Sequence, residues 1–261
     1  MTTPLDQAHA AMEAAPGDDA ARLRFFGLLA DSDLILLLDG EAGETLTPRV
    51  FPLEDGPVVA VFDADERLAA FAGGIAGYAA LPGRVIAAQL AGQGVGLALN
   101  LGVAPSSVLL PAEAMDWLAR TLAHAPEPVA GARPLGFRRP TLSPAARGAL
   151  ADRLARGAGL ARQALLAEAR YPDGRQGHVM AILGADPAAQ PALARSLAEA
   201  MTFAGLEDAM LDVAFPDADD ALVARMRPVA EVLDLPRPVA PPAATAPAAP
   251  GRDPDRPPKL R

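Results

Sequence analysis

The sequence contains no cysteine and few aromatic residues. The absence of cysteine excludes disulfide bonds, thiolate catalysis and metal sites with cysteine ligands. Aromatic residues make up only 4% of the 261 residues, whereas hydrophobic residues make up 51%, so the core is expected to be aliphatic. A chain of this length forms one large domain or two small ones. The sequence therefore predicts a folded protein whose core is built from alanine, leucine and valine.

Lysine is almost absent as well, because Lys259 is the only one in the chain. A phosphate loop of the Walker type, which requires a lysine after its glycines, is therefore excluded. Residues 92–96 alternate glycine with other residues, but they precede an expected strand. A dinucleotide loop instead follows a strand and opens a helix. We expect no nucleotide and no other cofactor.

The charge balance argues against nucleic acid as a partner. The formal net charge is −9, and such a chain is repelled by phosphate backbones unless it has a segregated basic face. Residues 85–112 contain no charged side chain. This stretch is longer than the roughly 20 residues that span a bilayer. Prolines, glycines and polar residues such as Gln89 and Asn100 interrupt this stretch. We therefore expect buried strand and helix there, and no membrane contact.

The few histidines do not form a metal motif. His9, His124 and His178 belong to different expected elements, and none has a second histidine three to five residues away. Acidic residues gather at expected helix starts, where they favour the helix dipole. We expect no metal site. His9 is interpreted as a solvated helix residue, and His178 as a surface residue on a strand.

Apolar periodicity predicts a first α+β domain over residues 1–124. Helices are expected over residues 3–15, with Thr3 as the N-cap, and from Asp18 onward. Strands are expected at 34–38, 46–53, 58–62 and 94–100, and further helices from residues 63–67 onward, from Pro82 and from Pro111. The first three strands are expected to form an antiparallel meander, with each strand paired to the next in sequence.

Composition changes after residue 124, where proline and glycine become frequent. This change predicts a linker over residues 125–142. The arginines around Phe137, which include Arg138 and Arg139, allow a second interpretation as a small basic anchor for a partner. The proline- and alanine-rich segment 236–261 cannot bury enough apolar area to become ordered, so it is expected to be a disordered tail.

A second α+β domain is expected over residues 143–235. Its clearest signal is a β-hairpin, because Pro172, Asp173 and Gly174 provide turn chemistry between two apolar runs. Other expected elements are a helix capped by Ser143, a helix at 187–203, a strand at 209–215 and a last helix at 218–233. Each domain should therefore hold a short mixed or antiparallel sheet packed with helices.

Two stretches of the first domain carry a family resemblance. The strand at 58–62 with the following residues 63–71, and the run 95–102 ending in Asn100-Leu101-Gly102, resemble the N-terminal domain of the SseB family. Leu101 stands where the family pattern has proline. Residues 171–174 and 177–178 resemble the family's C-terminal domain more loosely. The family is named after an enhanced serine sensitivity phenotype. The resemblance implies a two-domain cytoplasmic bacterial protein. It also implies that Asn100 and Gly102 have structural roles in a turn.

Two functions follow as hypotheses. The first is a non-enzymatic interaction or regulatory module with a protein partner, linked to serine or sulfur metabolism through the resemblance alone. The second is an enzyme or small-molecule binder with a site between the domains. Its candidate residues lie on the hairpin: Tyr171, Asp173 and His178, with Arg170 or Arg175 for an anionic ligand. In that case these side chains should meet Asn100 or Ser106 in one pocket. The oligomeric state is not predicted.

Overall fold

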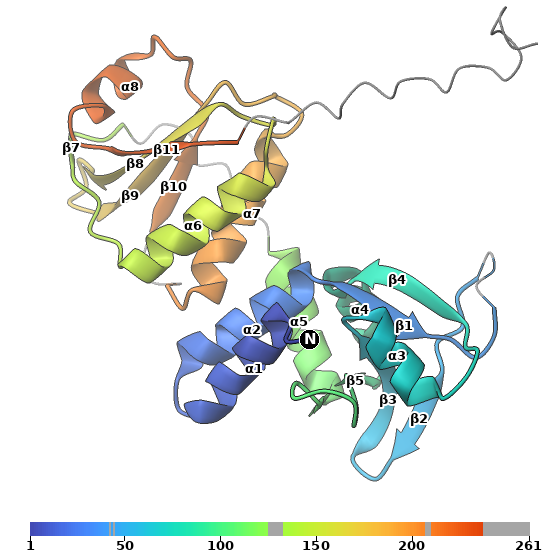
Figure 1. The fold of residues 1–261 in the computed structure, drawn as a ribbon. Coiled ribbons are helices and arrows are strands. Elements are labelled where there is room, and N and C mark those ends of the chain that lie inside the picture. The colour runs from blue at the N-terminus through green and yellow to red at the C-terminus, as the bar shows by residue number, and fades with distance from the viewer. Residues whose placement is uncertain (42, 44, 125–132, 207–209, 237–261) are drawn as a thin grey trace, which may run out of the picture.

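The computed structural model describes residues 1–41, 43, 45–124, 133–206 and 210–236. Within these ranges the chain forms two sheets, one of six strands and one of five, with helices on both faces of each. Figure 1 shows the sheets as separate units, with the first at the lower right and the second at the upper left. The predicted α+β class is confirmed. The predicted tail, apart from Pro236, and residues 125–132 of the predicted linker lie outside the described residues.

The first sheet is mixed and has the order β4-β1-β3-β5-β6, with β2 paired to the first half of β3. Strands β3 and β5 run parallel, so their carboxyl ends meet at one edge of the sheet. The strands are β1 Asp33–Leu37, β2 Val50–Leu53, β3 Gly56–Phe62, β4 Tyr78–Pro82, β5 Gly96–Leu99 and β6 Val108–Leu110.

Helices cover both faces of this sheet. The larger core lies under four helices and includes Phe25, Leu29, Leu97 and Met115. A smaller core lies on the opposite face, where Leu68 of the remaining helix packs near Phe62. The helices are α1 Pro4–Ala14, α2 Asp19–Asp31, α3 Asp65–Ala72, α4 Gly83–Leu90 and α5 Ala112–Ala123. Thr3 caps α1, as predicted, through a capping box with Asp6.

The second sheet has the order β10-β9-β8-β11, with β7 paired to β8. The predicted hairpin is confirmed as β8 Gln163–Arg170 and β9 Gln176–Leu183, and Gly174 in its turn has φ +86°. The other strands are β7 Gly136–Arg138, β10 Leu211–Ala214 and β11 Glu231–Asp234. Helices α6 Pro144–Arg156 and α7 Gln190–Phe203 pack on one face, and α8 Ala221–Met226 packs on the other.

Several sequence expectations were wrong. The helix expected over 218–233 ends at Met226, because Pro228 cannot supply the helical N–H, and β11 follows it. The sequence reading missed β4 and β6, and residues 136–138 of the predicted linker form β7. The expected meander is confirmed only in part: β2 pairs antiparallel with β3, but β1 meets the second stretch only at the bridge of Leu38 with Pro48 and pairs along β3 instead. Pro48 and Pro52 limit pairing in the stretch expected as one long strand, of which only β2 remains.

Two histidine expectations need correction too. His9 is buried, not solvated, and its ring packs edge-on against Phe25 with centroids 5.8 Å apart. His178 is also buried, with 8% of its surface exposed, although it was expected on the surface. His124 lies at the C-cap of α5. None of the described helices combines the length and apolar character that a bilayer span requires.

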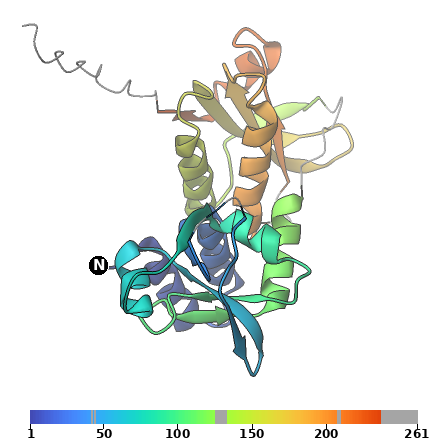
Figure 2. The ribbon, with the colours of Figure 1, turned by 90° about the vertical axis from the view of Figure 1, so that its right-hand side faces the viewer.

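The two sheet units touch through α2 and α7, which Figure 2 shows lying against each other between the two halves. Gly27 of α2 provides the closest approach, because a Cβ atom there would lie 2.8 Å from Cγ of Phe203. Beside this apolar contact, Asp31 binds Arg84 at 2.6 Å and Arg153 at 2.6 Å. Tight packing and ion pairs therefore join the halves.

Candidate functional site

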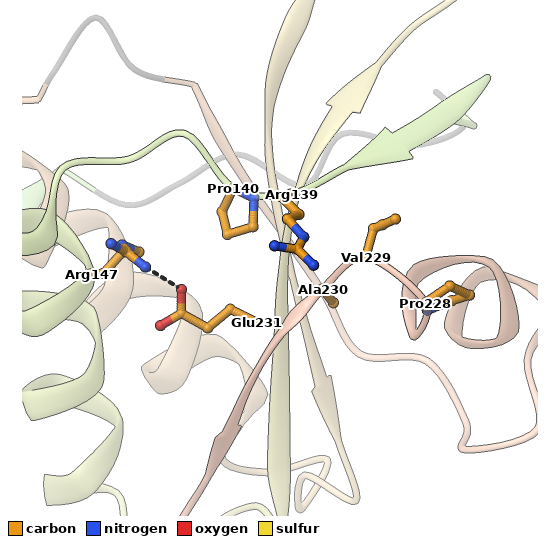
Figure 3. Close-up of a pocket in the computed structure, with 7 residues that line it drawn as sticks. All are labelled: Arg139, Pro140, Arg147, Pro228, Val229, Ala230 and Glu231. Atoms are coloured by element: carbon orange, nitrogen blue, oxygen red, sulfur yellow. Dashed lines mark hydrogen bonds and ion pairs between the residues drawn. The ribbon is translucent and has the colours of Figure 1, made fainter.

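A pocket of about 320 Å³ lies on the second sheet unit, between the segment after β7, helix α6 and the turn before β11. Its charged lining consists of Arg139, Arg147 and Glu231. Figure 3 shows Arg147 and Glu231 joined on one side, with Arg139 between Pro140 and the turn that leads into β11. The remaining lining is apolar and consists of Pro140, Pro228, Val229 and Ala230.

Three separate segments bring these residues together. Arg139 directly follows β7, which adds to the edge of β8 through pairing of Phe137 with Ala169. Arg147 lies near the start of α6, whose first turn is fixed by the Ser143 side chain accepting a hydrogen bond from the Ala146 N–H. The third segment is the turn after α8, which Pro228 starts and β11 ends.

Helix α8 also holds β7 in place. The Arg225 guanidinium lies 5.3 Å from the centre of the Phe137 ring, and it donates hydrogen bonds of 2.9 Å to the carbonyl oxygens of Pro134 and Leu135. A cation over an aromatic face combined with two hydrogen bonds fixes both segments. Arg139, next to the end of β7, therefore starts from a defined backbone position.

The electrostatics of the pocket favour an anion. Arg147 Nη1 lies 2.7 Å from Glu231 Oε2, but its Nε atom is buried without a hydrogen-bond partner among the described residues. Arg139 has no carboxylate within ion-pair distance in the described part of the chain. Two arginines against one glutamate leave one excess positive charge. An oxyanion in the pocket could accept from Arg139 and from the part of the Arg147 guanidinium that lines the pocket.

His178 borders the segment that carries Arg139. Its Nε2 atom accepts a 3.2 Å hydrogen bond from the backbone N–H of Thr141, and the Thr141 hydroxyl donates to Glu168 Oε2 at 3.0 Å. Burial lowers the pKa of His178 below its ordinary value, and the Glu168 carboxylate opposes this shift only partly. The ring is therefore neutral at neutral pH, with its proton on Nδ1.

The other predicted hairpin residues form a separate group at the turn. Tyr171 is buried and donates its hydroxyl to Asp212 of β10, and Arg175 lies 4.7 Å from the centre of its ring. Arg175 Nε also pairs with Asp173 at 2.6 Å. Burial, together with the Asp212 carboxylate, raises the pKa of Tyr171, so its hydroxyl stays protonated. The structure thus groups Tyr171, Asp173 and Arg175, whereas His178 contacts Thr141.

A second polar cluster lies at the carboxyl ends of β3 and β5. Arg67 of α3 pairs with Asp6 at 2.5 Å and with Asp63 at 2.7 Å, and its side chain is 9% exposed. Ser106 donates to Asp6 Oδ1 at 2.5 Å and accepts from Asn100 Nδ2 at 2.9 Å. All these side chains are buried or nearly so, and each charge has an opposite charge beside it.

The start of the chain completes this cluster. Thr3 donates its hydroxyl to Asp63 Oδ2 at 2.6 Å, and the Met1 carbonyl accepts from Arg67 Nη2 at 3.2 Å. Burial alone would raise the pKa of Asp6, but hydrogen bonds from Arg67, Ser106 and Thr3 lower it well below its usual range. The ion pair of Asp6 with Arg67 and the hydrogen bond of Thr3 to Asp63 therefore attach α1 to α3 and to the end of β3.

Asn100 and Gly102, the two motif positions, shape the turn after β5. Asn100 has φ +48° and Gly102 has φ +70°, both in the left-handed region. The Asn100 side chain also accepts from the Asp63 N–H at 3.2 Å, which links the turns after β3 and β5. The hydrogen-bond partners of Asn100 and Ser106 all lie in the first sheet unit, so neither joins the hairpin residues.

Residues 5–117 match the family described as SseB protein N-terminal domain. This part of the chain, which includes the turns after β3 and β5, is therefore similar to an SseB N-terminal domain. Neither the curated proteins nor the solved structures gave a match to the chain.

The matched residues include Asp6, Asp63 and Arg67 of the cluster but not the Arg139–Arg147 pocket, since the match ends at residue 117. The looser resemblance of the second half to the family's C-terminal domain stays a prediction. Asp31 and Arg84 of the first sheet unit meet Arg153 and Glu199 from the second unit. Burial would raise the pKa of Asp31, but Arg153 and Arg84 lower it overall, so this contact is ionic.

Sequence reasoning missed Arg147 and Glu231 and placed Arg139 only in a basic linker. Glu231 was hidden by the expected helix, although Pro228 and the alternation of Glu231 to Asp234 indicate a turn and a strand. No local signal joins Arg139 to Arg147, because strand pairing brings them together. No group of three or more possible metal ligands occurs among the residues that the structure describes.

Proposed function

We propose that the protein is a regulatory module that binds a small organic oxyanion in the pocket of Arg139, Arg147 and Glu231. The observation that carries this proposal is that two arginines, Arg139 and Arg147, line one pocket against the single carboxylate of Glu231. A planar guanidinium with one edge unpaired can donate to a carboxylate, sulfonate or phosphate oxygen. The apolar wall of Pro140, Pro228 and Val229 favours an anion with an apolar body.

Binding without turnover is the role that the lining supports best. Among the described residues that line the pocket, the ionisable ones are two arginines and a glutamate, and none is a hydroxyl or imidazole group. Arginine remains charged at physiological pH and holds an anion without exchanging protons. A protein partner, a cytoplasmic location and a link to serine or sulfur metabolism stay predictions from the family resemblance.

The test compares two neighbouring arginines of equal charge. Arg139 lines the pocket, whereas its neighbour Arg138 does not. Benzoate, benzenesulfonate and inorganic phosphate are titrated into wild type, Arg139→Gln, Arg147→Gln and the control Arg138→Gln by calorimetry. We expect the two organic anions to bind, and both pocket variants to bind at least about tenfold more weakly because a charged hydrogen bond is lost.

The three anions distinguish two classes of natural ligand, organic acids and phosphorylated compounds. Tighter binding of the two aromatic probes indicates an organic acid as the natural ligand, and tighter binding of phosphate indicates a phosphorylated one. The proposal is wrong if none of the probes binds the wild type, or if Arg139→Gln and Arg147→Gln bind them as Arg138→Gln does.

A further inference from the structure

The pocket depends on a segment with few attachments. Residues 139–142 connect β7 to α6 and thus lie between the two pocket arginines. Outside the strand ladders, Thr141 makes the hydrogen bonds described for this segment: its N–H donates to His178 Nε2, and its hydroxyl contacts Glu168 Oε2 at 3.0 Å and His178 Nε2 at 3.2 Å. Pro140 has no N–H to donate, and Leu142 is anchored by burial. The position of Arg139 is thus set from one side by β7 and from the other by Thr141.

The bond between Thr141 and His178 has a fixed direction. A backbone N–H can only donate, so His178 Nε2 must be the acceptor, and the imidazole must be neutral for the bond to form. Protonation would place a second N–H against the Thr141 N–H at 3.2 Å and turn an attraction into a repulsion. The backbone contact that fixes the segment to β9 would then be lost, and the protonated ring would have to turn toward the Thr141 hydroxyl, which lies 3.2 Å from Nε2.

We infer that His178 is a positioning residue, which holds Arg139 in the oxyanion pocket through the Thr141 N–H and releases it when the imidazole is protonated. His178 does not line the pocket, so it acts through the backbone of the segment. The result is a binding site that is intact at neutral pH and weakened by acid.

The surroundings of His178 set the direction of this response. The facing residue on β8 is Glu168, the facing residue on β10 is the apolar Leu211, and the segment itself brings Arg139. Burial lowers the pKa of His178 below 6.5, with Glu168 opposing part of the shift. A lowered pKa means that the folded state prefers the neutral ring, so stability and binding are full above pH 6.5 and fall as pH drops toward the folded-state pKa.

Binding of benzenesulfonate tests the inference, because this anion keeps its charge over the whole range. We expect wild-type affinity to be constant from about pH 8 down to the ordinary histidine range and to fall about tenfold at more acid pH, because the lowered pKa of His178 moves its charge change to the acid side of that range. His178→Gln keeps an acceptor but cannot be protonated, so it should bind like wild type at high pH and show no pH dependence. His178→Ala should bind weakly at both pH values. Thr141→Val retains the backbone N–H and removes the hydroxyl that lies 3.2 Å from Nε2, so a wild-type profile in this variant would assign the effect to the backbone bond.

Because the inference rests on the proposed oxyanion site, a second readout without ligand keeps the two failures apart. The Thr141 amide should exchange slowly with solvent in wild type and in His178→Gln, and rapidly in His178→Ala. If Thr141 exchange is the same in all three proteins, or if His178→Gln retains the wild-type pH dependence of binding, the inference is wrong. If Thr141 behaves as expected but no anion binds at high pH, the proposed ligand class is wrong instead.

Discussion

The two halves of the chain each contain an arginine beside carboxylates, yet the two arginines are placed very differently. Arg67 in the first sheet unit is 9% exposed, and carboxylates, a hydroxyl and a carbonyl surround both of its terminal nitrogens. Arg147 in the second unit is 35% exposed, has one carboxylate partner and leaves its Nε unpaired. A saturated, buried arginine holds the fold together. An arginine with an unpaired donor at a pocket can bind a ligand.

The first way to break this comparison is to remove each arginine in turn. Arg67→Leu should lower the free energy of unfolding by about 3 to 5 kcal/mol, because it leaves Asp6 and Asp63 buried without their counter-charge. Arg147→Leu should cost no more than about 1 kcal/mol, since its pair with Glu231 is partly exposed. Urea unfolding followed by circular dichroism measures both.

The effect of Arg67→Leu should also depend on pH. The pKa of Asp6 is lowered in the folded wild type, so its contribution to stability is present above the ordinary value of 3.8 and is lost as pH falls below it. Without Arg67 this contribution is absent, so the difference between wild type and variant should shrink in acid. Arg22→Leu, which removes an exposed pair with Asp19, serves as the control. Equal costs for Arg67→Leu and Arg22→Leu would contradict the structural role of the cluster.

A third arginine cluster, between the two halves, should have an intermediate effect. Asp31 contacts Arg84, Arg153 and Arg156 at 2.6 to 2.8 Å, but Arg156 is more than half exposed. Asp31→Asn should therefore lower the free energy of unfolding by about 1 to 3 kcal/mol. Because the contact joins the two halves, we expect calorimetry to show a single unfolding transition separating into two.

The control for this prediction is Asp33→Asn, two residues further along the chain. Asp33 is the exposed first residue of β1. Its replacement should leave the calorimetric profile unchanged. A single sharp transition in Asp31→Asn, at the wild-type temperature, would show that the apolar contact of Gly27 with Phe203 joins the halves without the ion pairs.

The sequence predicted the fold better in regions where local chemistry decides it. Thr3 at a helix start and Gly174 in a hairpin turn act on their own neighbours, so both elements were found. Strand β7 was missed because three residues of a proline-rich segment are ordered by pairing with β8, which no local pattern reveals. The last helix was predicted too long, because its apolar spacing continues past Pro228, which ends the helix.

The candidate site was harder to predict, for a related reason. His178 was singled out, but its role depends on Thr141, which lies 37 residues away in sequence. Arg139 and Glu231 reach one pocket only because β7 and β11 both pair with β8. The sequence alone does not show which arginine is buried in ion pairs and which lines a pocket. The folded structure distinguishes them: Arg67 is buried and fully paired, whereas Arg147 is partly exposed and has an unpaired Nε.

The smallest expected effect concerns the charge that already occupies the pocket. Glu231 pairs with Arg147 at 2.7 Å and therefore competes with an incoming anion for the same guanidinium. Glu231→Gln should bind benzoate about threefold more tightly, because it removes the charge repulsion between this side chain and a carboxylate ligand. The gain is small because water partly screens charges at this partly exposed site. Calorimetric titration measures the gain, and Asp234→Asn on the same strand, outside the pocket lining, is the matched control. Weaker binding in Glu231→Gln would mean that Glu231 orients Arg147 for the ligand and does not compete with it.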